Sequence, residues 1–199
     1  KGHGCLAYYA MLNIFKFISK KELFSFCNYD SNLGGHPDRN KSKFITASTG
    51  SLGHGLPIII GMAYAEKLNY GKKNFYVILG DQECLEGTTW ESLYVSNQYQ
   101  LNNLTIIIDR NYSREEAIGL GKLKNKLNGF SDIILDINGH KNDKIIKSLD
   151  LFNKTKKPKI IIANTTKGYG SKILEKNEWH HKFPKDEKEL DVLLKSIKI

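Results

Sequence analysis

Cysteine is scarce in this chain, and its scarcity argues against two classes of protein. The 199 residues include only three cysteines, Cys5, Cys27 and Cys84, which are widely spaced and form no CxxC pattern. Neither a disulfide framework nor a cysteine-based zinc site is therefore expected. A reducing cytoplasm is the predicted compartment.

Arginine is scarcer still relative to the overall charge. The chain has a formal net charge of +9, but its arginines are only Arg39, Arg110 and Arg114. The remaining basic residues are lysines spread along the sequence, without the clustering beside aromatic residues that marks a nucleic-acid-binding face. We therefore expect no nucleic-acid partner.

Long apolar runs are also missing. The stretch 56–63 is among the longest, and it is interrupted by Pro57 and Gly61. A membrane-spanning helix needs about 20 apolar residues, so no membrane segment is expected. With 40% apolar residues in 199, the chain is long enough for a sizeable core, and the prediction is one domain over residues 1–199.

Short apolar runs alternate with segments of helical spacing. Continuous apolar runs of this kind are typical of parallel strands that are covered on both faces. Strands are predicted at 75–79, 104–108, 133–137 and 159–163, and helices at 56–67 and 88–101, from about 142 and over 185–199. The predicted fold class is α/β, a three-layer sandwich with a mostly parallel sheet.

Two of these strands end in oxygen-bearing side chains. Asp81 follows the run 75–79, and Asn111 follows the run 104–108. Because a right-handed crossover brings the ends of parallel strands to one edge of the sheet, these side chains are expected to be neighbours. A carboxylate and an amide oxygen suit Mg²⁺ or Ca²⁺ bound to a diphosphate. The pattern alone leaves an alternative open, in which both residues serve as turn residues or helix caps.

A glycine-rich segment precedes the first of these strands. Residues 48–55 read STGSLGHG, and a helix is predicted to begin beside them at Leu56. Glycines let the backbone approach a ligand closely, and a helix N-terminus offers free N–H groups to an anion. The segment is a candidate phosphate cradle.

The sequence resembles the transketolase family in several separate blocks. Residues 80–111, from GDQECLEGTTWE to NLTIIIDRN, resemble that family's thiamine diphosphate signature, GDGxxxEGxxWEA followed by NLxxIxDxN. KGH at 1–3, GHPD at 35–38, STGSLGHG at 48–55, TTKGYG at 165–170 and NEWHHK at 177–182 resemble further family motifs in the same order. The resemblance implies a thiamine-diphosphate-binding fold.

The resemblance also implies roles for individual residues. It implies cofactor contacts from His3, Gly50, Leu52, Gly80, Asp81, Gln82, Asn111 and His180. It implies a metal shell of Asp81, Asn111 and the Ser113 backbone carbonyl, and catalytic roles for His36, His180 and Glu86. The structural alternatives are a turn residue for His36, a surface-loop cap for His180, a solvated side chain for His3 and a favourable helix N-terminal charge for Glu86.

The sequence departs from the family pattern at two places that bear on cofactor binding. Gln82 replaces the second glycine of GDG, and a side chain there needs room beside the diphosphate. The segment 112–127 is shorter than its family counterpart and lysine-rich, and we expect it to be mobile or rebuilt. The family also carries a further segment ahead of Lys1, which this sequence is expected to lack.

The chain has room for only one of the two thiamine-handling domains of a transketolase. The resemblance therefore implies the N-terminal subunit of a split enzyme that transfers a two-carbon ketol unit between sugar phosphates. Its implied partner is a C-terminal subunit with the pyrimidine-binding domain, in an α2β2 heterotetramer. The alternatives are a subunit of another thiamine diphosphate enzyme, acting on 2-oxo acids or an unusual sugar, and a non-catalytic partner that has lost the cofactor.

Overall fold

A four-stranded parallel sheet forms the centre of the protein. The computed structural model describes residues 1–112, 119–150, 155–175, 179 and 182–197. The strands are β1 (Phe75–Gly80), β2 (Leu104–Arg110), β3 (Ile134–Asn138) and β4 (Lys159–Asn164), arranged in the order β1-β2-β4-β3. All three strand pairs are parallel, as the apolar runs predict. The predicted α/β class is confirmed.

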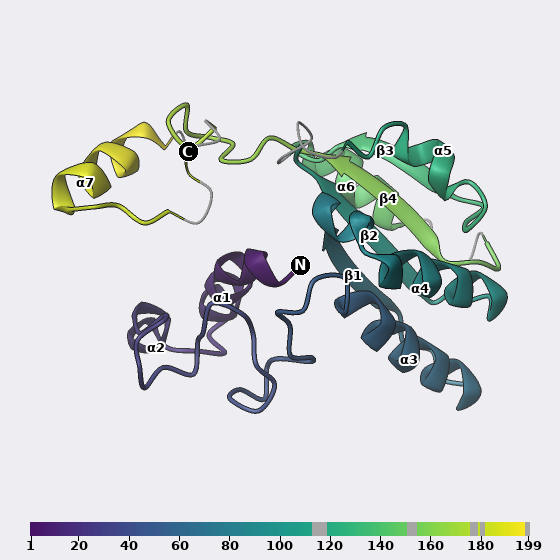
Figure 1. Cartoon of the computed structure of the whole chain (residues 1–199). Helices are drawn as coiled ribbons and strands as arrows, with labels where there is room; N and C mark the ends of the chain where they lie inside the picture. Colours follow the sequence, from purple (N-terminus) through teal and green to yellow (C-terminus); the bar gives the residue numbers. More distant parts are fainter. Residues whose placement is uncertain (113–118, 151–154, 176–178, 180–181, 198–199) are drawn as a thin grey trace.

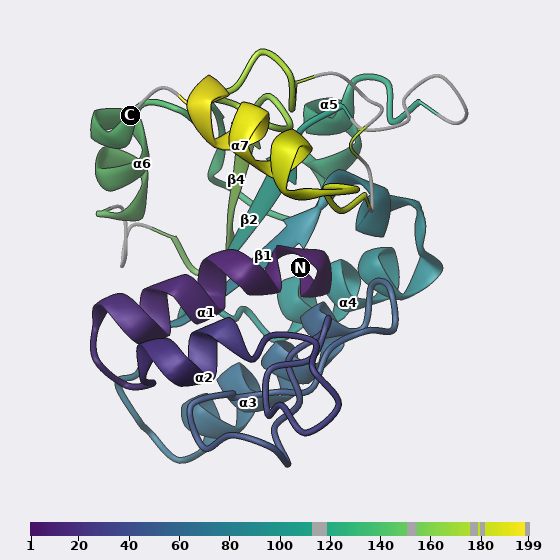
Figure 2. The ribbon, with the colours of Figure 1, turned by 90° about the vertical axis from the view of Figure 1, so that its left-hand side faces the viewer.

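Helices occupy both sides of this sheet (Figures 1 and 2). On one side, apolar side chains of α3, α4 and α5 join those of β1, β2 and β4 in the main core. Helix α6 packs against β3 and lies on the other side of the sheet in Figure 2. The described helices are α1 (Cys5–Ile14), α2 (Lys20–Phe24), α3 (Gly55–Leu68), α4 (Gly87–Gln98), α5 (Leu123–Leu127), α6 (Asn142–Leu149) and α7 (Glu187–Ser196), with 3₁₀ turns η1 (Gly2–Gly4) and η2 (Asp81–Leu85).

The second sheet face is only partly covered within the described residues. Tyr76 and Ile78 of β1 point away from the main core and are 47% and 51% exposed. Farther along the same face, Ile161 of β4 is 2% exposed. The three-layer arrangement is thus complete over β3 and β4 and open over β1.

The N-terminal helices form a smaller core of their own. Side chains of α1 pack with residues of the following loop, in a cluster of Cys5, Tyr9, Leu12, Ile18, Leu33 and Ile45. The hydroxyl of Tyr9 donates to the Gly34 carbonyl at 3.0 Å, and burial raises the pKa of this hydroxyl to about 12. These contacts hold residues 33–45 against α1, beside the sheet (Figure 1).

Helix α5 corrects the expectation for the segment 112–127. Leu123 and Leu127 are one helical turn apart, and both are fully buried in the main core. Burial of this pair outweighs the lysines between them, because the lysine side chains can remain in solvent. Residues 119–127 are therefore a packed part of the fold, while residues 113–118 lie outside the described part of the chain.

Among the residues that the structure describes, no helix has the length and apolar character needed to cross a bilayer.

The three cysteines give a direct test of this packing. Cys5 and Cys84 are buried, whereas Cys27 is exposed. Burial, together with the nearby charges of Asp81 and Glu83, raises the pKa of Cys84 to about 12 although it lines a surface pocket. At pH 8 we expect one thiol in three to react rapidly with Ellman's reagent, and all three after denaturation. A Cys27→Ser variant should lose the rapid phase, and rapid labelling of Cys84 would contradict the packing.

Candidate functional site at the carboxyl edge of the sheet

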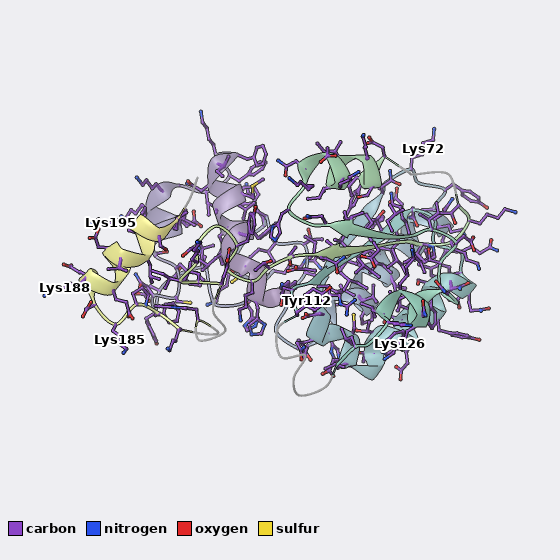
Figure 3. The ribbon with its side chains drawn as sticks, turned by 90° about the horizontal axis from the view of Figure 1, so that it is seen from above. Lys72, Tyr112, Lys126, Lys185, Lys188 and Lys195 are labelled. Carbon is purple, nitrogen blue, oxygen red and sulfur yellow. The ribbon has the colours of Figure 1, made fainter. Side chains whose placement is uncertain are left out.

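The carboxyl ends of the four strands meet along one edge of the sheet. Gly80 of β1 is in register with Asp109 of β2, and Arg110 is in register with Asn164 of β4. Figure 3 shows Tyr112, which follows β2, at the edge facing α1 and α7, with Lys72 at the opposite edge. Open α/β sheets bind ligands at the edge where Tyr112 lies.

Asp81 and Asn111 meet at this edge. Asp81 is only 2% exposed, and its carboxylate accepts the backbone N–H of Gln82 at 2.9 Å. The backbone of Asn111 also donates a hydrogen bond to Asp81. Burial is the largest influence on Asp81 and raises its pKa, because the ionised form is poorly solvated. The structure therefore brings the two predicted oxygen ligands together and gives one of them an environment that favours a nearby cation.

Asp109 lies beside this pair and has the opposite electrostatic character. Burial alone would raise its pKa, but hydrogen bonds from Lys1 and Thr165 outweigh burial, and the pKa is lowered. The Lys1 ammonium forms an ion pair with Asp109, and its side chain passes over Gly80. A methylene of Lys1 is 3.6 Å from the position a Cβ on Gly80 would take. Lys1 thus places a positive charge across the strand ends.

The glycine loop lies against the same region. Gly50 and Gly53 have φ angles of 138° and 77°, which favour glycine. A Cβ on Gly53 would come within 2.8 Å of Glu86 and Thr88. The loop therefore seats closely against the start of α4, and Leu52 between the two glycines is 40% exposed.

Two histidines from separate motifs approach each other next to this loop. The rings of His3 and His36 are 5.0 Å apart and nearly perpendicular. The Nε2 atom of His36 and the hydroxyl of Thr49 are buried without a hydrogen-bond partner among the described residues. Both surround Gly2, where a Cβ would lie 2.7 Å from the His36 ring and 3.0 Å from the Thr49 hydroxyl. Buried polar atoms normally have partners, so this pair is suited to a polar ligand.

Glu86 occupies the N-cap position of α4. Its side chain makes no capping hydrogen bond, and its backbone N–H donates to the Glu83 carbonyl at 3.2 Å. A carboxylate at this position is favoured by the helix macrodipole, so the structural role expected for this charge fits the geometry. The carboxylate also remains available for a proton-transfer role.

The loop after β4 closes the far side of the edge. The backbone N–H of Thr166 donates to Nε2 of His140 at 2.8 Å, and the Tyr169 ring stacks on His140 at 3.7 Å. Gly139 permits this approach, because a Cβ there would lie 2.5 Å from the Thr165 methyl. Thr165 in turn donates to Asp109, so the loop is joined to β2 and β3.

Two predicted site residues lie outside the described part of the chain. These are Ser113, expected as the third metal ligand, and His180, expected at the reacting centre. Trp179, next to His180, is described, and the Lys182 ammonium lies 5.7 Å from the centre of its ring. Within the described residues no group of three His, Cys, Asp or Glu side chains could hold a metal ion.

The sequence analysis did not identify several residues of this edge. They are Lys1, Thr49, Asp109, His140 and Thr165. Asp109 and Thr165 could have been found, because each follows or ends a predicted strand as Asp81 does. His140 gave no such signal, since its partner Thr166 comes from another strand end.

The fold and the edge together define a class. The protein is an open parallel α/β protein with a glycine loop and an acidic residue arranged for a phosphate-bearing ligand. The family model described as "Transketolase, thiamine diphosphate binding domain" matches residues 1–197. The chain belongs to this family, and the predicted family membership is confirmed.

Relatives and solved structures agree with this assignment. One of the two subunits of an apulose-4-phosphate transketolase from Actinobacillus succinogenes is 36% identical over 204 residues, covering 100% of this chain and 74% of the relative. The 6-deoxy-6-sulfo-D-fructose transketolase subunit SqwG of a Clostridium species is 30% identical, covering 88% of this chain and 66% of the relative. The crystal structure of the Campylobacter jejuni transketolase matches with a TM-score of 0.81 and 28% identity, covering 90% of this chain and 30% of that one.

Proposed function

We propose that residues 1–199 form the diphosphate-binding subunit of a split transketolase. It would transfer a two-carbon ketol unit from a ketose phosphate to an aldose phosphate, using thiamine diphosphate and a divalent metal. The observation that carries the proposal is the meeting of Asp81 and Asn111 at the carboxyl edge, beside the glycine loop. The match to the thiamine diphosphate binding domain family supports the cofactor.

The residues present fit thiamine diphosphate. Gly50 and Gly53 have backbone conformations that keep the loop free of side chains, and Gly2 has no room for a Cβ beside His36 and Thr49. The partnerless Nε2 of His36 and hydroxyl of Thr49 supply hydrogen-bonding atoms that a polar ligand would satisfy. We propose cofactor contacts from His3, Gly50, Leu52, Gly80, Asp81, Gln82, Asn111 and His180.

The divalent ion would be held by Asp81, Asn111 and Ser113. Two of these lie together at the strand ends, and hard oxygen ligands suit Mg²⁺ or Ca²⁺. A cation at this point would offset the desolvation that raises the pKa of Asp81. The positive side chain of Lys1, paired with Asp109, adds to a field that favours the diphosphate.

When bound, the cofactor supplies an electron sink for cleavage of the bond between C2 and C3 of the ketose. The chain's own residues position the substrate and exchange protons with it. His36 would hold a substrate hydroxyl through Nε2, which has no other partner among the described residues. His180 would act on a second hydroxyl, and Glu86 would exchange a proton at the interface with the partner subunit.

The partner would be a C-terminal transketolase subunit that carries the pyrimidine-binding domain, in a cytoplasmic α2β2 heterotetramer. The names of two relatives as transketolase subunits support the need for a second polypeptide. Those names also point to phosphorylated or sulfonated sugars as substrates of the relatives. We propose an anionic ketose as donor for this chain.

One observation favours a second candidate, a non-catalytic partner subunit. The backbone N–H at Gln82, the position of the missing family glycine, donates to Asp81 rather than pointing freely into the edge. A side chain at this position also takes up space beside the expected diphosphate. Loss of cofactor binding would leave the chain as a structural subunit.

Reconstitution with the partner separates these functions. We expect calorimetric titration of the complex with thiamine diphosphate and Mg²⁺ to give saturable heat. We also expect turnover with xylulose 5-phosphate and ribose 5-phosphate but not with pyruvate, and parallel assays with apulose 4-phosphate and 6-deoxy-6-sulfofructose would identify the donor. Turnover of pyruvate would indicate a 2-oxo-acid enzyme, and absence of both heat and turnover would establish the structural role.

A further inference from the structure

Glu83 is a buried carboxylate to which the proposed chemistry gives no role. It is the third residue of η2 and is only 6% exposed. A buried carboxylate is costly unless hydrogen bonds satisfy it, so its partners show what it does in the fold.

The two oxygens of Glu83 accept hydrogen bonds from two glycines of different motifs. Oε2 accepts the backbone N–H of Gly80 at 2.7 Å, and Oε1 accepts the backbone N–H of Gly53 at 3.3 Å. Gly80 ends β1, whereas Gly53 lies 30 positions before Glu83 in the glycine loop. One side chain thus connects the loop to the strand end that precedes Asp81.

The first of these bonds has an ordinary local explanation. A glutamate at the third position of a helical turn commonly accepts the N–H of the residue that caps the turn. The bond to Gly53 has no such explanation, because Gly53 belongs to a separate segment. Gly53 is also confined by Glu86 and Thr88, and its φ of 77° sets the direction of its N–H.

We propose that Glu83 is a positioning residue, whose carboxylate fixes the glycine loop 50–53 against the turn at Gly80 and Asp81. The two walls of the phosphate cradle are then held at a set separation before any ligand binds. The identity of the ligand as thiamine diphosphate rests on the proposed function, whereas the clamp itself does not.

Hydrogen exchange on the full chain without cofactor tests the clamp directly. Glu83→Gln keeps the size of the side chain but presents an NH₂ group to one of the two N–H donors, and Glu83→Ala removes both acceptors. Because a hydrogen bond to a charged group is lost, we expect exchange in residues 48–55 to accelerate at least about tenfold, with β1 and β2 unchanged. Glu187→Gln, an exposed glutamate of α7, is the matched control.

The outcomes are distinct. Unchanged exchange in residues 48–55 in both variants would overturn the proposal. An equal acceleration across the loop and the sheet in both variants would also overturn it, since Glu83 would then affect only overall stability.

Cofactor titration of the reconstituted complex adds a second readout. Glu83→Gln should weaken thiamine diphosphate binding by about tenfold while its melting temperature stays near that of the control, as expected for lost pre-organisation. If the wild-type complex binds no thiamine diphosphate, the proposed function fails, and hydrogen exchange still decides whether the clamp exists.

Discussion

Asp81→Asn is expected to abolish metal-dependent cofactor binding while leaving the unliganded chain folded. The substitution removes the one carboxylate of the proposed metal shell, and we expect the affinity for thiamine diphosphate with Mg²⁺ to fall by at least about 100-fold. Calorimetric titration of the reconstituted complex measures this loss. Ketol transfer should disappear in the same variant.

The effect of Asp81→Asn on stability should have the opposite sign. Burial raises the folded-state pKa of Asp81, so its ionised form destabilises the fold at neutral pH. This destabilisation disappears as the pH falls through the raised pKa, because the protonated form is the one that the fold favours. Removing the charge should therefore leave the melting temperature at pH 7 unchanged or higher, which differential scanning calorimetry can measure.

Asp109→Asn is the matched control for this variant. Hydrogen bonds from Lys1 and Thr165 outweigh the effect of burial and lower the pKa of Asp109, so its ionised form stabilises the fold. That contribution is present above the ordinary aspartate pKa and is lost as the pH falls through the lowered value. Asp109→Asn should lower the melting temperature at pH 7. Equal destabilisation by both variants, with cofactor binding retained in Asp81→Asn, would contradict the proposed metal site.

Gly168→Ala is expected to produce the largest structural effect. Gly168 has a φ of 74°, and a Cβ there would lie 2.1 Å from the backbone oxygen of Leu174. Because the contact is with backbone, relief requires the loop itself to move, and we expect a loss of roughly 2 to 4 kcal/mol in unfolding free energy. Urea denaturation measures this loss. The displaced loop should also release Thr165 from Asp109, and thereby weaken cofactor binding.

Gly61→Ala provides the matched control for a glycine substitution. Gly61 lies inside α3, and nothing is within 4 Å of the position its Cβ would take. Alanine should therefore raise the unfolding free energy by about 0.5 to 1 kcal/mol through helix propensity. A Gly168→Ala variant as stable as this control would show that residues 165–175 follow a different backbone path.

The main elements could be predicted because each carries its own pattern. The runs that became β1, β2 and β4 are apolar throughout, and the predicted helix 56–67 agrees with α3 at Gly55–Leu68. The short elements η2, α2 and α5 were not predicted. In five residues a repeat of 3.6 is too short to recognise, and α5 depends on the burial of Leu123 and Leu127 against the sheet.

The position of the candidate site could be predicted in part from topology. Parallel strands joined by crossovers must end at one edge, so the proximity of Asp81 and Asn111 follows from their order in the chain. The contacts that give Asp81 and Asp109 opposite pKa shifts could not be predicted in this way. They depend on where the Lys1 and Thr165 side chains point.

By itself the sequence determined the parallel α/β fold, the family and the edge at which the family motifs meet, because hydrophobic periodicity and strand order are local or topological properties. Only the tertiary structure decided that Glu83 joins Gly53 to Gly80, and that His140 accepts the N–H of Thr166. Hydrogen bonds between segments far apart in sequence depend on distances of a few tenths of an ångström. Such distances are set by the packing of the whole core, and no local pattern records them.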